Sequence, residues 1–425
     1  MNSSAPTGEV SRLTEHLFRH ESGRLVSMLT GIFGINRLQM AEDVVQEALI
    51  RALKTWPFYG VPANPAAWLM QTAKHLALDL IRREKLFQDK LPQLTTFLDE
   101  DGHGTEQAVH FEEEIADGRL RLMFACCHPQ IPQESQIALA LKTLCGFSPA
   151  EIAKAFLTSE AATIKRLTRA RQKIQELNIP FEIPSGPELS GRLEAVLHIL
   201  YLLFSEGYKA SSGESLIREE FCHESIRLGE LLACHPLTGG PRTRALLALL
   251  WLNAARLNAR TDGEGEILRL REQDRSLWNH EMIAQGIRHL GLATGGDDLS
   301  QYHLQAGIAA CHCVAPSYDS TDWQRILAYY DHWVRMDDSP VVALNRAVAL
   351  AQVRGPEAGI AAVEAITRRE QLDSYHLVYA VLGEFESQRN NFEAAAAHFR
   401  KALQLAELRA EQSLLQQKLK AIEAG

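Results

Sequence analysis

Apolar residues recur at helical spacing along almost the whole chain. In the segment 65–85, for example, apolar residues three or four positions apart predict a buried stripe: Leu69, Ala73, Leu76 and Leu80. No stretch alternates β-branched and polar residues over the length of a strand with hairpin signals around it. The pattern therefore predicts an all-α protein built of amphipathic helices.

Two breaks interrupt this pattern. The acidic, glycine-containing run LDEDGHGTEQ cannot support a core, which predicts a flexible linker over 87–118. The run NIPFEIPSGPELSG has three prolines, which end the preceding helix and open a new domain near Ser190. We expect small helical domains at 10–86 and 119–178 and a larger helical domain at 190–425.

Composition is ordinary for a globular protein of several domains. A chain of 425 residues exceeds one compact core. It has no apolar run of about 18 residues, so no membrane span is expected. The start MNSSAPTGEV lacks a basic segment followed by an apolar one, and the odd number of cysteines, 7, argues against a disulfide framework. We therefore expect a cytoplasmic protein with reduced thiols.

Charge is unevenly distributed. The net charge of -9 does not suit a nucleic-acid binder, but the segment 158–174 is basic, with Glu160 as its single acid. Its bases are Lys165, Arg166, Arg169, Arg171 and Lys173. The average over the chain thus hides one basic helix.

The basic helix belongs to a helix-turn-helix pattern. Ser148, Pro149 and Glu151 form a capping box that starts a first helix, which buries Ile152, Ala153 and Phe156. A short turn at 157–159 precedes the basic helix, whose apolar side carries Leu167, Ala170 and Ile174. A second helix of this kind enters the major groove of DNA. The alternative is an ordinary solvated face.

A second informative block spans 41–84. Its first helix buries Val45, Ala48 and Ala52 and is expected to show an acidic face outward: Glu42, Asp43, Gln46 and Glu47. The following loop, WPFYGVPANP, offers aromatic surfaces that could stack an unpaired base, although such aromatics are more often core residues. The next helix leaves Gln71, Lys74, His75 and Arg82 on a face that could follow a DNA strand.

The C-terminal part contains a near repeat. In 374–407, six residues fall at the offsets of a tetratricopeptide unit, a helix pair of about 34 residues: Tyr379, Leu382, Gly383, Ala395, Phe399 and Ala402. The preceding unit, 339–372, keeps Ala349 and Ala361, and the number of copies stays open. A concave helical-repeat surface usually binds a peptide or protein, so we expect a protein partner here.

Together the blocks resemble an extracytoplasmic-function sigma factor of the sigma-70 family. The run AEDVVQEALIRAL is similar to region 2.2, NPAAWLMQTAKHLALDLIRRE to regions 2.3 and 2.4, and IALALKTLCGFSPAEIAKAF with SEAATIKRLTRARQKI to region 4. The remainder resembles the tetratricopeptide-like extension of one branch of these factors. The resemblance implies core RNA polymerase (β′ clamp and β flap) and promoter DNA as partners.

It also implies a role for each matching residue. Glu42, Asp43, Gln46 and Glu47 would dock on the β′ clamp, and the loop with Trp56, Phe58, Tyr59 and Asn64 would capture a flipped base of the -10 element. Gln71, Lys74, His75 and Arg82 would follow the adjoining strand. The -35 element would meet Glu160, Thr163, Lys165, Arg166, Arg169 and Lys173. His75, Leu157, Thr163 and Ile164 depart from the commonest family pattern, so the preferred promoter sequence stays open.

No enzyme chemistry is predicted. There is no GxxxxGK[ST] run, and we expect no catalytic residues and no cofactor. A metal-sensing alternative would use His303, Cys311, His312 and Cys313, or Cys126, Cys127 and His128. Neither set has the paired CxxC spacing of a structural zinc site, so no metal is expected.

Three further possibilities remain open. The chain could be a helix-turn-helix regulator that acts without polymerase, or an enzyme or scaffold built on the repeat domain. The acidic residues from Asp99 to Glu114 could compete with DNA for the basic helix, although a solvated spacer is the simpler interpretation. The repeat domain itself is expected to regulate activity.

Overall fold

The computed structural model describes residues 21–85, 117–156, 158–177, 187–210, 217–262, 267–295 and 299–423. Within these ranges the regular structure is helical, and the one pairing of extended backbone is a bridge between Thr261 and Ile267. The predicted all-α class is confirmed. In the same ranges no helix is long and apolar enough to cross a membrane.

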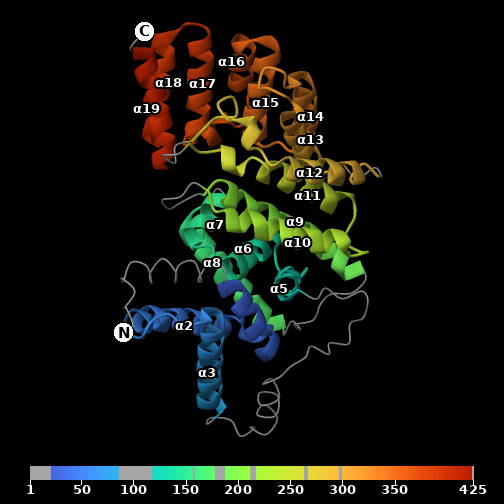
Figure 1. Ribbon diagram of the computed structural model, residues 1–425, viewed down its shortest axis with the longest axis vertical. Coiled ribbons are helices and arrows are strands. Elements are labelled where there is room, and N and C mark those ends of the chain that lie inside the picture. Colours follow the sequence, from blue (N-terminus) through green and yellow to red (C-terminus); the bar gives the residue numbers. More distant parts are fainter. Residues whose placement is uncertain are drawn as a thin grey trace. The chain divides into compact units, whose positions relative to one another are not determined.

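The chain divides into two compact units (Figure 1), residues 1–202 with 235–238 and residues 203–234 with 239–425. A domain start near Ser190 was predicted, but the division falls inside α9 (Pro187–Tyr208). The start of α9 is tied to the first unit because the buried Arg192 donates a 3.1 Å hydrogen bond to the carbonyl of Phe124.

In the described part of the first unit, the first helix covers residues 21–33. The unit continues through η1 (Ile35–Arg37), α2 (Leu38–Tyr59), α3 (Pro65–Lys85), α5 (Gly118–Cys126), α6 (Gln133–Cys145), α7 (Pro149–Ala155) and α8 (Glu160–Leu177). Helix α2 packs on α3, whereas α6 and α7 pack on α8. The helix 21–33 lies directly against the end of α6, because a Cβ at Gly23 would collide with the carbonyl of Leu144.

Most of the expected linker, 87–116, lies outside the described residues, and so does the acidic stretch from Asp99 to Glu114. The last two residues of the expected linker, Asp117 and Gly118, lie at the start of a helix. The carboxylate of Asp117 accepts hydrogen bonds from the backbone N–H groups of Arg119 and Leu120, at 2.9 and 3.1 Å. This N-cap starts α5 at Gly118.

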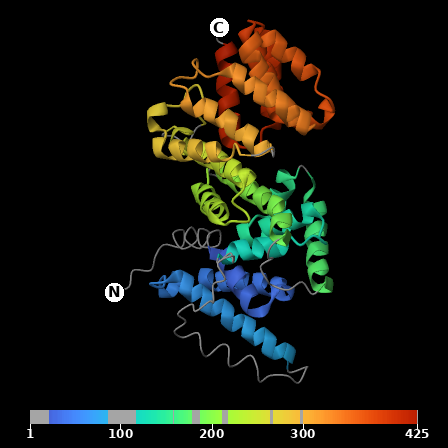
Figure 2. The same ribbon diagram turned by 90° about the vertical axis from the view of Figure 1, so that its right-hand side faces the viewer.

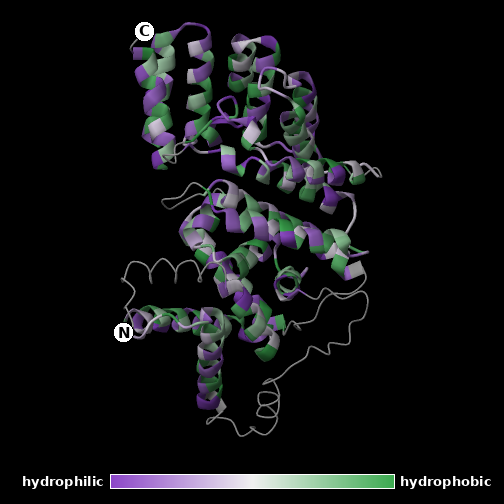
Figure 3. Cartoon of the chain, viewed as in Figure 1, coloured by the Kyte–Doolittle hydropathy of each residue, from purple (hydrophilic) through white to green (hydrophobic). Residues whose placement is uncertain are grey.

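The second unit is a succession of helices, many of which pack on the next along the chain (Figures 1 and 2). After α9 it contains α10 (Glu219–Cys234), α11 (Pro241–Ala254), η3 (Leu257–Ala259), η4 (Arg275–Leu277), α12 (His280–Leu292), α13 (Gln301–Val314), α14 (Trp323–Met336), α15 (Pro340–Arg354), α16 (Pro356–Glu364), η5 (Arg369–Leu372), α17 (His376–Gln388), α18 (Phe392–Leu405) and α19 (Arg409–Glu423). Its helices carry both hydrophobic and hydrophilic residues along their length (Figure 3), as amphipathic helices do.

The predicted helix pair of 374–407 is present as α17 and α18. Ala395, Phe399 and Ala402 are buried between helices. A Cβ at Gly383 would lie 2.9 Å from the ring of Phe399, so the glycine allows this close approach. Gly383 and Tyr379 of α17 therefore pack against α18, whereas Leu382 belongs to a core cluster with residues of α15 and α16.

Candidate nucleic-acid interface

Helices α7 and α8 form the predicted helix-turn-helix. The hydroxyl of Ser148 accepts a hydrogen bond from the backbone N–H of Glu151 at 3.1 Å, and the Glu151 carboxylate accepts one from the Ser148 N–H at 2.7 Å. This capping box fixes where α7 begins. On α8 the apolar stripe is buried as predicted: Leu167, Ala170 and Ile174.

The basic side chains of α8 are not equally available. Lys165 and Arg169 are exposed. Arg166 keeps only 24% of its side chain exposed, since it pairs with Glu134 at 2.5 Å and lies 5.5 Å from the centre of the Phe156 ring. Lys173 lies 3.8 Å from Glu176. Lys165 and Arg169 are therefore the cations that DNA could reach most directly.

The burial of Thr163 corrects one expected DNA contact. Its side chain is 0% exposed, and its hydroxyl donates to the carbonyl of Ser159 at 3.2 Å. Thr163 thus secures the first turn of α8 and offers nothing to a groove. Glu160, at the start of the helix, is exposed.

The aromatic segment also differs from expectation. Helix α2 continues through Pro57 to Tyr59 and ends at Gly60, whose φ of 84° lies in the left-handed region. Trp56 is therefore not in a loop. It is 2% exposed and meets Trp68 edge to face with 5.4 Å between ring centres, which corrects its expected stacking role. Phe58 and Tyr59 are 80% and 82% exposed.

Asn64 lies exposed at the start of α3. Its side-chain oxygen accepts a 3.1 Å hydrogen bond from the backbone N–H of Ala67, so the residue caps the helix. A base could reach the Asn64 amide only at the cost of this cap or through its remaining donors.

The buried stripe of helix α3 includes some residues that differ from those predicted. Its buried positions are Leu69, Ala73, Ala77 and Ile81, whereas Leu76 is half-buried and Leu80 is 38% exposed. The expected DNA-facing residues remain accessible. Gln71 and His75 are exposed, Lys74 is half-buried, and Arg82 is 62% exposed beside Asp79.

A hollow of about 490 Å³ adds two cations that sequence reasoning missed. Arg51 and Lys54 of α2 line it together with Trp68 and His75 of α3. Arg51 is half exposed and pairs with Glu47 at 3.2 Å. The spacing of three residues between Arg51 and Lys54, which places both on one helix face, was the available signal.

The acidic face of α2 is only partly as predicted. Asp43, Gln46 and Glu47 are exposed. Glu42 is 7% exposed and faces inward, where its carboxylate accepts hydrogen bonds from Thr143 and Arg171, both at 2.7 Å. Thr143 lies on α6 and Arg171 on α8. The expectation that Glu42 faces outward is therefore wrong.

The cysteines and histidines that were considered as metal ligands are buried or hydrogen-bonded within the fold. Cys126 and Cys127 are buried, and burial raises the pKa of the Cys127 thiol to about 12, which keeps it protonated. His303 accepts a hydrogen bond from the N–H of Ser300 and so caps α13. Among the described residues, no three His, Cys, Asp or Glu side chains are arranged to hold a metal ion.

Comparison with known families gives three matches. Residues 17–87 match Sigma-70 region 2, residues 121–174 match Sigma-70 region 4, and residues 192–294 match a family of unknown function, DUF6596. The first two matches cover α2, α3 and the helix-turn-helix. The third covers most of α9 and continues through α12.

Three relatives are similar over different lengths. An uncharacterized protein of Rhizobium meliloti (strain 1021), R00370, is 38% identical over 387 residues, which is 90% of either chain. The probable RNA polymerase sigma factor RfaY of Xanthomonas campestris is 32% identical over 32% of this chain and 33% of its own length. The ECF RNA polymerase sigma factor SigX of Bacillus subtilis (strain 168) is 26% identical over 28% and 61%. No solved structure matches the chain.

Proposed function

The chain belongs to the sigma-70 family of RNA polymerase sigma factors, and on that premise we propose that α2 docks on core polymerase while α3 and α8 recognise the -10 and -35 elements. Factors of this family bind core polymerase and promoter DNA and are not enzymes. The observation that carries the proposal is the order of the two matched regions, each with exposed groups suited to its partner.

The polymerase contact is assigned to Asp43, Gln46 and Glu47. These exposed side chains form an acidic patch on α2 that suits the cationic β′ clamp. Helix α7 with α8 would contact the β flap. Glu42 could join the acidic patch only after its bonds to Thr143 and Arg171 are released.

Strand opening is assigned to the exposed end of α2. Phe58 and Tyr59 offer ring faces on which an unpaired -10 base could stack, and stacking of this kind stabilises a base by about 1–3 kcal/mol. The hollow with Arg51, Lys54 and His75 could hold the adjoining phosphates. Gln71, Lys74 and Arg82 would extend this track along α3.

The -35 element is assigned to α8, with Lys165 and Arg169 as the principal contacts. Arg166 and Lys173 would contribute after exchanging their carboxylate partners for phosphates. Glu160 sits at the N-terminal end of the same helix, the end that base edges meet in this motif.

The second unit is proposed to regulate the first. It follows the two DNA-binding regions in the same chain, and helical repeats commonly present binding surfaces. A chain ending after Leu202, which retains the first part of α9, is expected to initiate differently from the full chain under at least one condition. Equal initiation throughout would remove the regulatory role.

The polymerase assignment is testable by binding. Fluorescently labelled full chain is titrated with purified core polymerase, and Asp43→Asn with Glu47→Gln is expected to weaken binding about tenfold, or ~1.4 kcal/mol. Glu393→Gln, an exposed acid on α18, is the matched control and should change nothing. Unchanged binding by the double variant would reject this docking face.

A further inference from the structure

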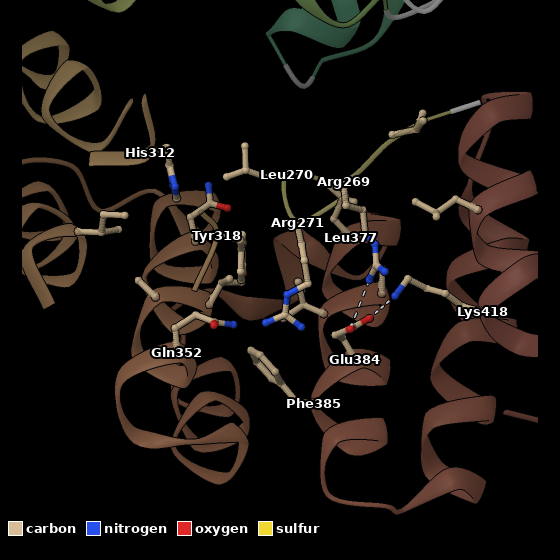
Figure 4. Close-up of a pocket in the computed structure, with 18 of the residues that line it drawn as sticks. Arg269, Leu270, Arg271, His312, Tyr318, Gln352, Leu377, Glu384, Phe385 and Lys418 are labelled. Atoms are coloured by element: carbon tan, nitrogen blue, oxygen red, sulfur yellow. Dashed lines mark hydrogen bonds and ion pairs between the residues drawn. The ribbon is translucent and has the colours of Figure 1, made fainter. Parts of the chain in front are cut away.

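The second unit contains a cavity of about 540 Å³ that the sigma-factor assignment leaves without a role (Figure 4). Most of its lining is apolar or aromatic, including Tyr318, Trp323, Tyr330 and Phe385. Cavities of this size and character are typical of sites for small organic molecules.

The charged residues that line the cavity are mainly cations. Five are basic, and two are acidic: Lys209, Arg260, Arg269, Arg271 and Lys418, with Glu384 and Glu411. Both acids are already paired. Glu411 lies 2.6 Å from Lys209, and Glu384 bridges Lys418 and Arg269 (Figure 4).

Among the described residues, neither Arg260 nor Arg271 forms an ion pair with an acid that lines the cavity. Arg271 points into the open space between Gln352 and Glu384 (Figure 4), and its ion pair is a 3.7 Å contact with the strongly exposed Asp319. Arg260 lies over the Tyr208 ring, 3.6 Å from its centre, and donates to the Tyr208 carbonyl. The cavity thus has a surplus of positive charge.

Behind Arg260 lie two more arginines, which together with it form what we call the arginine cluster: Arg256, Arg260 and Arg275. Arg256 is 8% exposed and donates to the Tyr208 hydroxyl at 3.1 Å. The Trp278 ring lies beside the guanidinium groups of both Arg256 and Arg275. Arg275 donates to the carbonyls of His312 and Ala315 at 2.6 Å.

Within the part of the chain that the structure describes, the cluster has no acidic counterpart. The three arginines donate hydrogen bonds to neutral groups of Tyr208, Asn253, His312 and Ala315, and no aspartate or glutamate of the described residues forms an ion pair with them. Burial, and then the neighbouring Arg256, lower the pKa of Arg260. Burial, followed by Arg256 and Arg275, also lowers the pKa of the cavity residue His312 to about 3, so His312 is neutral near pH 7.

Several buried polar atoms of the cluster also lack a partner within the described chain. They are Nε of Arg256 and Nη2 of Arg275, and beside the cluster Nε1 of Trp278 and Nδ1 of His312 lack a partner as well. Buried cations and donors without partners destabilise a fold unless something satisfies them. An anion would offset the repulsion within the cluster and accept hydrogen bonds from it.

We propose that this cavity binds a small organic anion. Its carboxylate, sulfonate or phosphate group would lie at Arg260 and His312, in the field of Arg256 and Arg275. Its apolar or aromatic body would pack against Tyr318, Trp323 and Tyr330. Binding of the anion does not depend on the proposed regulatory role of the second unit. An effect of the anion on transcription rests on that proposed role.

The test uses two fluorescent probes that share an aromatic body. One is 1-anilinonaphthalene-8-sulfonate, which is an anion, and the other is N-phenyl-1-naphthylamine, its counterpart without the sulfonate. The full chain should bind the sulfonate at least tenfold more tightly than the neutral probe. Octanoate and benzoate should displace the sulfonate, and inorganic phosphate, which lacks an apolar body, should displace it at least tenfold less well.

Substitutions locate the site. Arg260→Met should weaken sulfonate binding at least tenfold and leave the neutral probe unaffected, whereas Arg260→Lys should retain most of the affinity. Arg354→Gln, an exposed arginine of α15, is the control and should bind as the unmodified chain does. Without ligand, Arg260→Met should melt at the same temperature as the unmodified chain or higher, because it removes like-charge repulsion; a purely structural arginine would lower it.

The proposal is overturned if both probes bind equally, or if Arg260→Met binds the sulfonate as the unmodified chain does. Should Arg260→Met fail to fold, Arg271→Gln is the second variant, with an expected loss of about threefold and rejection if affinity is unchanged. These measurements need no polymerase. If the probes do not bind as expected, the proposed sigma activity is not affected. If the chain has no sigma activity, the proposal that the cavity binds an anion is not affected.

Discussion

The carboxylate of Glu42 lies 2.7 Å from the guanidinium of Arg171, and this ion pair joins α2 to α8 within the first unit. Thr143 of α6 donates to the same carboxylate. The helix 21–33 adds the close approach of Gly23 to Leu144. The parts of the chain that match Sigma-70 regions 2 and 4 are thus joined through a residue of the proposed docking helix.

Breaking that pair is expected to destabilise the first unit. Arg171→Ala leaves the 7% exposed Glu42 without its cation, which should lower the free energy of unfolding by about 2 kcal/mol, less than for a fully buried pair because Arg171 keeps 21% of its side chain exposed. Urea denaturation measures the change. Arg169→Ala, on the exposed side of α8, is the control, and equal stability of the two variants would contradict the prediction.

The aromatic residues of α2 should separate into structural and functional ones. Trp56→Ala is expected to cost about 3–5 kcal/mol of stability because it opens a cavity beside Trp68. Phe58→Ala and Tyr59→Ala should leave the melting temperature unchanged and reduce permanganate reactivity of -10 thymines in promoter complexes. Normal strand opening by the Phe58→Ala, Tyr59→Ala double variant would exclude base stacking by this pair.

The exposed cations of α8 should govern the salt dependence of promoter binding. Each phosphate contact contributes a slope of about -0.9 to the plot of log affinity against log salt concentration. Lys165→Ala with Arg169→Ala should therefore reduce the slope by about 2 units, as measured by anisotropy with a labelled promoter and holoenzyme. The control Arg400→Ala, on α18, should keep the original slope, and an unaltered slope in the double variant would place the DNA contact elsewhere.

Acid stability of the second unit should depend on Glu411. Burial alone would raise the pKa of Glu411, but hydrogen bonds and charges from His376 and Lys209 outweigh it and lower the pKa to about 2. A lowered pKa in the folded state contributes stability above the pKa of the unfolded chain, and this is lost as the pH falls from about 4.5 toward 2.

Glu411→Gln should therefore melt at a lower temperature than the unmodified chain at pH 6, and the difference should shrink by pH 3. Differential scanning calorimetry at both pH values gives the comparison, with Glu364→Gln, an exposed acid of α16, as the control. A difference that stays constant with pH would contradict the lowered pKa.

Local signals in the sequence predicted the local structure well. The capping box at Ser148 and Glu151 places the start of α7, because both bonding partners lie within three residues. The small and aromatic residues spaced along 374–407 predict the helix pair, because helical spacing decides which side chains face each other. The same reasoning found the buried stripe of α8.

Errors arose where the deciding contact is distant or the local signal is ambiguous. Glu42 appeared to face outward because its partner Arg171 lies 129 residues away in sequence. Pro57 suggested a loop, yet α2 continues through Pro57 to Tyr59. The arginine cluster comes from segments that follow α11, and two of its members contact Tyr208 at the end of α9, so no local pattern in the sequence shows that Arg256, Arg260 and Arg275 lie close together.

Run-off transcription with purified core polymerase tests the central claim most directly. Promoters are first selected from a random DNA library with the reconstituted holoenzyme, and the full chain is then added to core polymerase on these templates. The account predicts transcripts from defined start sites that require the chain and fall at least tenfold with Lys165→Ala and Arg169→Ala. A chain that binds duplex DNA yet yields no transcript with core polymerase on any selected template would contradict it.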